Sequence, residues 1–156
     1  MYWTLELASY LSDAPWPATK DELIDYAIRT GAPLEVVENL QELIEDEQFW
    51  NIIKIDEKKL FFQSLNRIYI YDEPAQTFKI IDSETTITKM YKANNSVYFQ
   101  EMNLGLFQIV GDKKVLVSGD EILKNDVITN IFSFGGELLI LNQNNGFYVL
   151  KNGSTI

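Results

Sequence analysis

Two pairs of acidic residues are the groups in this sequence whose type and spacing fit known chemistry. Asp82 and Glu84 are separated by one residue, and a pair of carboxyl groups supplies the acid and the base of most glycoside hydrolases. Asp112 and Asp120 flank a predicted loop, and carboxylate oxygens are preferred ligands of Ca²⁺. Neither pair belongs to a longer motif, because the D-x-D-x-D-G arrangement of a calcium loop is missing. We therefore predict no catalytic residue and no metal site.

The sequence contains no histidine and no cysteine. Histidine is the commonest general base and a common transition-metal ligand, and cysteine supplies thiolate nucleophiles and ligands. These absences exclude Ser-His-Asp triads, Cys-His proteases, zinc fingers and disulfide frameworks. A phosphate-binding loop is missing as well, since Gly135 and Gly136 are not followed by a lysine and a helix. We predict that the protein is not an enzyme and that it holds no cofactor.

Aromatic side chains within the predicted strands are the candidates for contact with a ligand. Such rings can stack on sugars, and rings inside strands also pack between neighbouring sheets. Both interpretations stay open from the sequence. The candidate interaction residues are Tyr69, Tyr71, Tyr98, Phe107 and Tyr148.

The distribution of charge divides the chain near residue 48. The 156 residues have a net charge of −10, and residues 1–48 hold eleven acidic residues against two basic ones. Residues 49–156 hold twelve acidic residues against eleven basic ones. An acidic surface repels phosphate, so we predict no nucleic-acid partner. No apolar run is long enough for a membrane span, and the N-terminus lacks signal-peptide features, so as written the chain is expected to be cytoplasmic.

Residues 1–48 have the apolar spacing of three short helices, the first of which ends at Leu11. Thr19 and Glu22 have the spacing of a capping box at the start of the second helix. Gly31 is placed to end that helix in the left-handed conformation. The predicted core residues of the second and third helices are Leu23, Ile24, Ala27, Ile28, Leu34, Val37, Leu40, Leu43 and Ile44.

The same residues resemble a small bacterial family of unknown function. The resemblance is carried by the pair Tyr10 and Leu11, a short gap, and residues 16–23 with the sequence WPATKDEL. The corresponding family pattern is YL, a gap, and [YFW]-P-A-[TS]-K-[DE]-E-L. The resemblance implies a compact three-helix module with no established activity.

From residue 49 onward the helical spacing gives way to short strands rich in β-branched and aromatic residues. Residues 87–109 recur 41 residues later as residues 128–150, and an earlier copy starts at Trp50. Each copy holds about four strands in about 40 residues, which is typical of a β-propeller blade. The predicted fold class is α+β, with a three-helix module at 1–48 and an incomplete β-propeller at 49–156. About three four-stranded antiparallel blades are predicted. Their bounds are about 49–84, 85–124 and 125–156.

These repeats resemble the propeller repeats of the ligand-binding sensor domain of bacterial hybrid two-component regulators. Residues 103–109 (NLGLFQI) and 144–150 (NNGFYVL) fit the recurring phrase x-x-G-l-y-x-y/l of those repeats. The resemblance implies a sensor of a glycan or another small molecule, and such relatives are periplasmic. Those sensors have many blades followed by a membrane span and signalling domains, which this sequence lacks. We therefore interpret the chain as a fragment, a fusion or a chimera related to such sensors.

These observations lead to three hypotheses of function. The first is a non-catalytic interaction protein that binds a protein partner or associates with itself, because so few blades cannot close a ring and the terminal blades would expose apolar sheets. A remnant whose blades pack irregularly is the alternative explanation of the same pattern. The second hypothesis is a module that senses a glycan or a small molecule, and the third is a glycoside-active enzyme. The helical module is predicted to pack on the first blade through Trp50.

Overall fold

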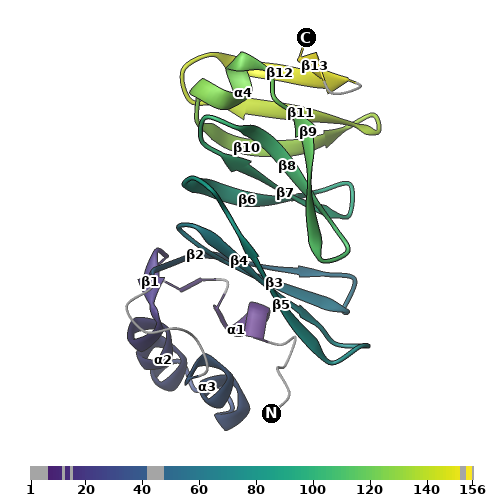
Figure 1. Cartoon of the computed structure of the whole chain (residues 1–156). Helices are drawn as coiled ribbons and strands as arrows, with labels where there is room; N and C mark the ends of the chain where they lie inside the picture. The colour runs from purple at the N-terminus through teal and green to yellow at the C-terminus, as the bar shows by residue number, and fades with distance from the viewer. Residues whose placement is uncertain (1–6, 12, 15, 42–47, 152–153, 156) are drawn as a thin grey trace. The chain divides into compact units, whose positions relative to one another are not determined.

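The chain forms helices in its first part and antiparallel sheets in the rest (Figure 1). Two compact units are present, unit 1 with residues 1–80 and unit 2 with residues 81–156. The predicted α+β class, with N-terminal helices followed by three antiparallel sheets, is confirmed. The computed structural model describes residues 7–11, 13–14, 16–41, 48–151 and 154–155.

Three short helices precede the sheet of unit 1 in the described part of the chain. They are α1 (Leu7–Leu11), α2 (Lys20–Arg29) and α3 (Leu34–Gln41). The helix α2 begins at the predicted capping box, and Gly31 follows its end with a φ of +78°. This left-handed conformation is the one that favours glycine after a helix.

The buried faces of α2 and α3 differ in part from the predicted faces. The residues buried as predicted are Leu23, Ala27 and Leu40. Ile28 and Leu34 were expected in the core, but they are 61% and 70% exposed, and Val36 is buried instead. Val36 and Leu40 are four residues apart and form the inward stripe of α3, whereas Leu34 is its first residue and points away from that stripe. The predicted core positions Leu43 and Ile44 lie outside the described residues.

Sheet 1 has five strands, one more than the four predicted for the first blade. The strands are β1 (Ala18–Thr19), β2 (Gln48–Ile55), β3 (Lys59–Ser64), β4 (Arg67–Asp72) and β5 (Thr77–Asp82), and neighbours in sequence are neighbours in the sheet. The extra strand comes from the helical region, where Ala18 pairs with Phe49. Ala18 follows a proline that interrupts the helical pattern, so this short segment is extended and completes the edge of β2.

The helices share one hydrophobic core with sheet 1, so the predicted packing of the helical module on the first sheet is confirmed. Phe49 is fully buried, with ring centroids 5.7 Å from Phe62 and 5.7 Å from Tyr69. Trp16 lies against the same cluster, 6.3 Å from Phe62. The prediction that Trp50 makes this contact was wrong, because Trp50 is 36% exposed and is not a member of this core. Successive residues of a strand point to opposite faces, which places Phe49 inward and Trp50 outward.

Unit 2 contains two four-stranded sheets that pack face to face (Figure 1). Sheet 2 consists of β6 (Ile87–Ala93), β7 (Ser96–Glu101), β8 (Gly105–Val110) and β9 (Lys113–Ser118). Sheet 3 consists of β10 (Ile128–Phe134), β11 (Glu137–Asn142), β12 (Gly146–Lys151) and β13 (Ser154–Thr155). A short helix that the sequence did not predict, α4 (Glu121–Asn125), connects them.

The turns explain why the 41-residue repeat produces the same hairpin twice. Asn94 and Asn95 have φ values of 49° and 58°, and the repeat-equivalent Gly135 and Gly136 have values of 56° and 82°. Two successive residues with positive φ form the turn that suits the twist of a two-residue hairpin. The first long strand of each of the three sheets also shows a register shift near its start.

Candidate functional site

The aromatic residues predicted for ligand contact are distributed over both units. Tyr69 and Tyr71 lie in the core that sheet 1 shares with the helices, and Tyr98 lies in the core between sheets 2 and 3. Phe107 is half-buried and stacks on a neighbouring ring, that of Phe99, at 5.6 Å, and Tyr148 is half-buried on β12. For the first three, packing is the role that the geometry supports, since each is less than 8% exposed. A role of these residues in ligand binding stays a prediction.

Burial also fixes the protonation of two tyrosines in unit 2. Burial raises the pKa of Tyr91 to about 12, and it raises the pKa of Tyr98 as well. The hydroxyl of Tyr91 donates a hydrogen bond of 2.7 Å to the carbonyl oxygen of Ile128, the first residue of sheet 3. Tyr91 therefore acts as a neutral donor that holds the two sheets together.

The acidic pairs do not assemble a larger site in the part of the chain that the structure describes. Asp82 is exposed at the end of β5 and Glu84 is exposed in the following loop. Asp112 is exposed in the turn before β9, and Asp120 directly precedes α4. No group of three or more acidic residues that could hold a metal ion is found among the described residues.

Gln100 forms a buried polar centre that sequence reasoning missed. Its Nε2 donates hydrogen bonds to the carbonyl oxygens of Leu123, at 2.8 Å, and Asp126, at 2.6 Å. Its Oε1 accepts hydrogen bonds from the amide of Ile128, at 2.9 Å, and from the hydroxyl of Thr88, at 3.0 Å. Because three of these partners belong to the segment that enters sheet 3, Gln100 attaches that segment to sheet 2.

A second polar cluster surrounds the buried carboxylate of Asp126. The carboxylate accepts hydrogen bonds from the Asn144 amide at 3.1 Å, from the Asn144 side chain at 3.0 Å and from the Asn145 side chain at 2.7 Å. Burial by itself would raise the pKa of Asp126, but these hydrogen bonds, together with one from the amide of Val127, lower it below the ordinary value. A cavity of about 290 Å³ lies beside the cluster, lined by Glu121, Ile122, Asn125, Asp126, Asn144 and Asn145.

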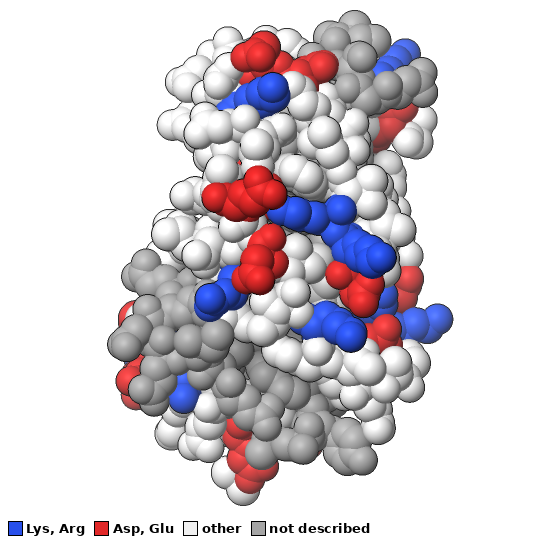
Figure 2. All heavy atoms as spheres, viewed as in Figure 1, with Lys and Arg blue, Asp and Glu red and all other residues white. Residues whose placement is uncertain are grey.

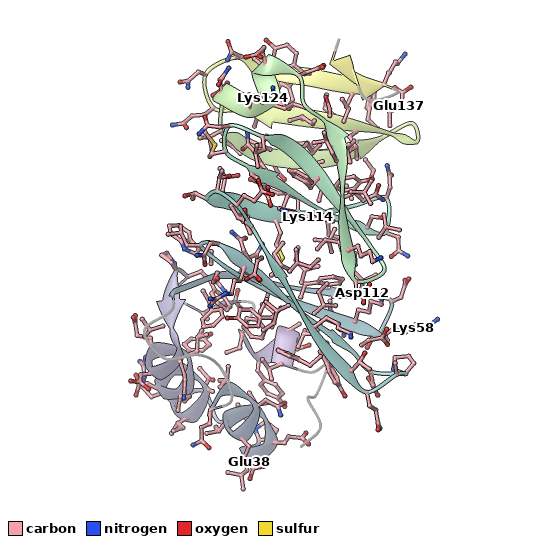
Figure 3. All side chains as sticks on the ribbon, viewed as in Figure 1. Glu38, Lys58, Asp112, Lys114, Lys124 and Glu137 are labelled. Carbon is pink, nitrogen blue, oxygen red and sulfur yellow. The ribbon has the colours of Figure 1, made fainter. Side chains whose placement is uncertain are left out.

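A third polar contact joins two strands of sheet 2. Glu101 is fully buried, and its Oε1 lies 2.7 Å from Nζ of Lys114, which is labelled in Figure 3. The same Nζ lies 5.2 Å from the ring centroid of Phe107. Oε2 of Glu101 has no hydrogen-bond partner within the described residues. The ion pair links β7 to β9, which suits a role in fixing the sheet.

An exposed apolar feature of unit 2 is the face of sheet 3 that points away from sheet 2. Strand alternation places on this face the residues Phe132, Phe134, Leu139, Leu141, Phe147 and Val149, and we call it the outer face of sheet 3. The register aligns Phe132 with Leu139, and Leu139 in turn with Val149. The three phenylalanines are 42%, 56% and 61% exposed. Apolar patches of this kind on a protein surface mark interaction sites.

Charged side chains show no comparable concentration on the face of the molecule drawn in Figure 2. There acidic and basic groups are interspersed among uncharged residues, and neither sign forms a continuous field over the described residues. Ion pairs such as Lys54 with Glu57, at 2.8 Å, join neighbouring groups of opposite sign. Exposed pairs of this type contribute little to stability. The outer face of sheet 3 differs from this charged surface, because three of its large apolar side chains are exposed.

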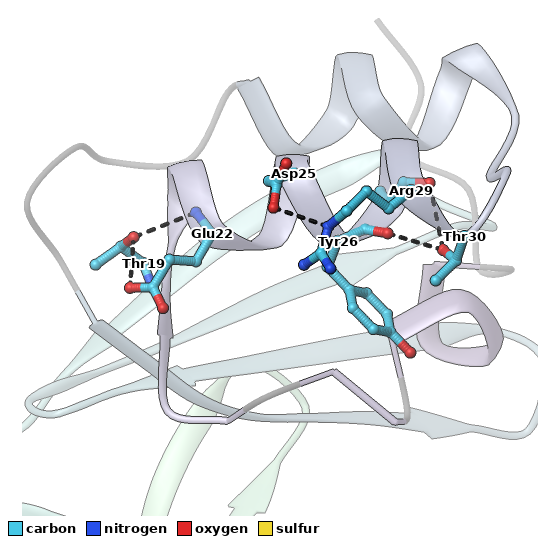
Figure 4. Close-up of polar contacts among 7 residues, drawn as sticks. Thr19, Glu22, Asp25, Tyr26, Arg29 and Thr30 are labelled. Carbon is cyan, nitrogen blue, oxygen red and sulfur yellow. Dashed lines mark hydrogen bonds and ion pairs between the residues drawn. The ribbon is translucent and has the colours of Figure 1, made fainter.

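The motif residues of the N-terminal part have structural roles. The amide of Glu22 donates to the hydroxyl of Thr19 at 3.3 Å, and the amide of Thr19 donates to the carboxylate of Glu22 at 3.4 Å (Figure 4). This is the predicted capping box. The indole of Trp16 donates to the carbonyl oxygen of Leu11 at 3.0 Å. These contacts fix the start of α2 and the chain before it.

Comparison with known families bears on this N-terminal part. Residues 2–55 match the model of a family described as "Protein of unknown function (DUF2795)". The predicted resemblance of residues 1–48 to a family of unknown function is thus confirmed, and the match continues through β2. The predicted resemblance of the later repeats to two-component sensor propellers stays a prediction.

Among solved structures, the crystal structure of the N-terminal domain of Nup159 is similar to this chain at 12% identity and a TM-score of 0.47. The similarity covers 73% of this chain and 32% of that one, so the chain spans about a third of that structure. No curated protein sequence matches the chain. Within the described residues, no helix has the length and hydrophobicity required to cross a bilayer.

Proposed function

We propose that the protein is a non-catalytic interaction module built from propeller-type sheet repeats. The observation that carries this proposal is the exposed outer face of sheet 3, with three exposed phenylalanines in one register-aligned patch. Large exposed apolar side chains cost free energy in water, and covering them on association recovers about 25 cal/mol per Å². A protein partner or a second copy of the chain is the kind of partner that covers such a surface.

The repeat supports an incomplete propeller as the architecture. Sheets 2 and 3 derive from segments 41 residues apart, and they pack face to face through apolar residues, as neighbouring blades of a propeller do. In such an array each sheet needs a neighbour on both faces. A relation to the sensor domains of two-component regulators is part of this proposal.

Recognition of a glycan is the second candidate function. The cavity beside α4 favours it, because Asn125, Asn144 and Asn145 line it with side-chain amides that suit sugar hydroxyl groups. Calorimetric titration with a panel of saccharides distinguishes the two candidates. Heat that disappears in an Asn145→Ala variant would favour sugar binding, and no heat with any saccharide is expected of an interaction module.

Site-specific photocrosslinking in living cells tests the proposed interaction surface. Phe147 is replaced by the photoreactive analogue p-benzoylphenylalanine, which is close to phenylalanine in shape, and the cells are irradiated. We expect a covalent adduct heavier than the 18.0 kDa chain. Phe78 on β5, which is 42% exposed, is the matched control position and is expected to give no comparable adduct. No adduct from Phe147 would contradict the proposal.

A further inference from the structure

We infer that the partner of the outer face of sheet 3 is a second copy of this chain, docked through the same face about a two-fold axis. The inference rests on the proposed function, and it names the occupant that the proposed function leaves open. In a two-fold dimer the same patch on both copies meets itself, so the patch must be self-complementary. Three features of the described residues meet this requirement.

The first feature is the set of residues that the repeat places on the equivalent face of sheet 2. That face is buried under sheet 3, with Tyr91, Ala93, Tyr98 and Leu106 in the shared core. The residues 41 positions later are those of the outer face of sheet 3: Phe132, Phe134, Leu139 and Phe147. The outer face of sheet 3 thus occupies the positions that, in sheet 2, are covered by a neighbouring sheet. A covering sheet is therefore the geometry that this face fits.

The second feature is that sheet 3 lacks the polar side chains by which sheet 2 binds the sheet that follows it. Tyr91 and Gln100 bind the backbone of Ile128 at the entry to sheet 3. Their equivalents in sheet 3 are Phe132 and Leu141, which have no hydrogen-bonding group. The face is built to meet another hydrocarbon surface rather than the backbone of a connected sheet. A second outer face of sheet 3 is such a surface.

The third feature is that the large exposed apolar side chains in the described part of sheet 3 all lie on its outer face. On sheet 1 the helices bury Phe62 and Tyr69, although Phe78 on β5 stays 42% exposed. A symmetric pairing needs no surface other than this face on either copy.

Area and charge are compatible with this arrangement. With about 200 Å² for a phenylalanine ring, the exposed fractions of the three rings sum to about 300 Å² of apolar surface on each copy. A standard interface buries about 800 Å² on each partner, including a polar rim, so the three rings supply less than half of that area and the dimer is expected to be weak and dependent on concentration. Glu137 and Lys151 lie together at the rim, 3.9 Å apart, and give the face no net charge. The like charge of two acidic chains is concentrated in residues 1–48, outside unit 2.

Cysteine crosslinking tests the two-fold symmetry directly, because the natural sequence contains no cysteine. Single variants Leu139→Cys, Leu141→Cys and Val149→Cys place one thiol each near the middle of the face, and Asp112→Cys places one in an exposed turn of the same unit. A residue close to a two-fold axis meets its own copy within disulfide distance. We expect at least one of the three face variants, and not Asp112→Cys, to form a disulfide-linked dimer under mild oxidation.

A disulfide-linked dimer of Asp112→Cys, with none from the three face variants, would overturn the symmetric arrangement. The photocrosslink at Phe147 separates the remaining outcomes. An adduct of twice the 18.0 kDa chain mass supports the second copy, whereas an adduct of another mass keeps the interaction surface and rejects the second copy. The double variant Phe132→Ser/Phe147→Ser is expected to lose the dimer, and Phe78→Ser is expected to keep it. Circular dichroism of each variant establishes that it is folded.

Discussion

Replacing Gln100 by leucine tests the buried polar centre of unit 2. Leucine is what the third repeat has at the equivalent position 141, so the change exchanges one repeat's residue for another's. It removes four hydrogen bonds of 2.6 to 3.0 Å and leaves the Leu123 and Asp126 carbonyls and the Ile128 amide without this partner. Each buried polar group that loses its partner costs about 1–3 kcal/mol.

The expected loss of unfolding free energy for Gln100→Leu is about 3 kcal/mol, since burial of the new methyl groups offsets about 1 kcal/mol of the total. Gln108→Leu is the matched control, because Gln108 is half-buried and its Nε2 donates one hydrogen bond of 3.2 Å to the hydroxyl of Ser96. Its expected cost is below about 1 kcal/mol. The comparison between the two variants isolates the buried position from the general effect of removing an amide.

Urea denaturation measures both variants, and the choice of probe matters. All three tryptophans lie in residues 1–80, so tryptophan fluorescence reports on unit 1. Far-UV circular dichroism reports on all the sheets, and the transition of unit 2 is the one expected to shift for Gln100→Leu. If Gln100→Leu is no less stable than Gln108→Leu, the role assigned to this residue is wrong.

Three further predictions concern single residues. Gly105→Ala is expected to lower the free energy of unfolding by at least ~3 kcal/mol in thermal unfolding, because the new Cβ would overlap the Ser118 carbonyl oxygen. The equivalent Gly146→Ala has open space around the new Cβ and is expected to cost only about 1–2 kcal/mol, for its positive φ. Equal costs for the two variants would contradict this prediction. Thr19→Ala removes the capping box and is expected to lower stability by about 1 kcal/mol in urea titrations followed by tryptophan fluorescence, and an unchanged midpoint would argue against the cap. The pKa of Asp126 is lower in the folded chain than its ordinary value of 3.8, so the ionised carboxylate stabilises the fold. This stabilisation is complete above pH 3.8 and is lost as the pH falls through the pKa of the folded state. The difference in stability between the natural chain and Asp126→Asn should therefore shrink in acid denaturation below that pH, and a difference independent of pH would refute it.

Features with local causes were predictable from the sequence. The capping box depends on two residues three positions apart, and the hairpins depend on turn residues with positive φ. The 41-residue repeat predicted successive sheets because one alternating pattern occurs more than once. In each case the information lies within a few residues or within one repeat.

Features set by contacts between distant residues were not predictable in this way. Phe49 and Trp50 are adjacent aromatics, and only the register with β3 decides which of them faces the helices. Gln100 acts on residues 23 and more positions away, which no local spacing encodes. The outer face of sheet 3 had a usable signal, since aligning Tyr91 with Phe132 shows a polar group replaced by hydrocarbon.

Sedimentation velocity of the unmodified chain over a series of micromolar concentrations tests the central claim most directly. The claim is that the outer face of sheet 3 brings two copies together. The result we expect is a mass that rises from 18.0 kDa towards twice that value with concentration, and that stays at 18.0 kDa for Phe132→Ser/Phe147→Ser. A single species of 18.0 kDa at every concentration of the unmodified chain would contradict it.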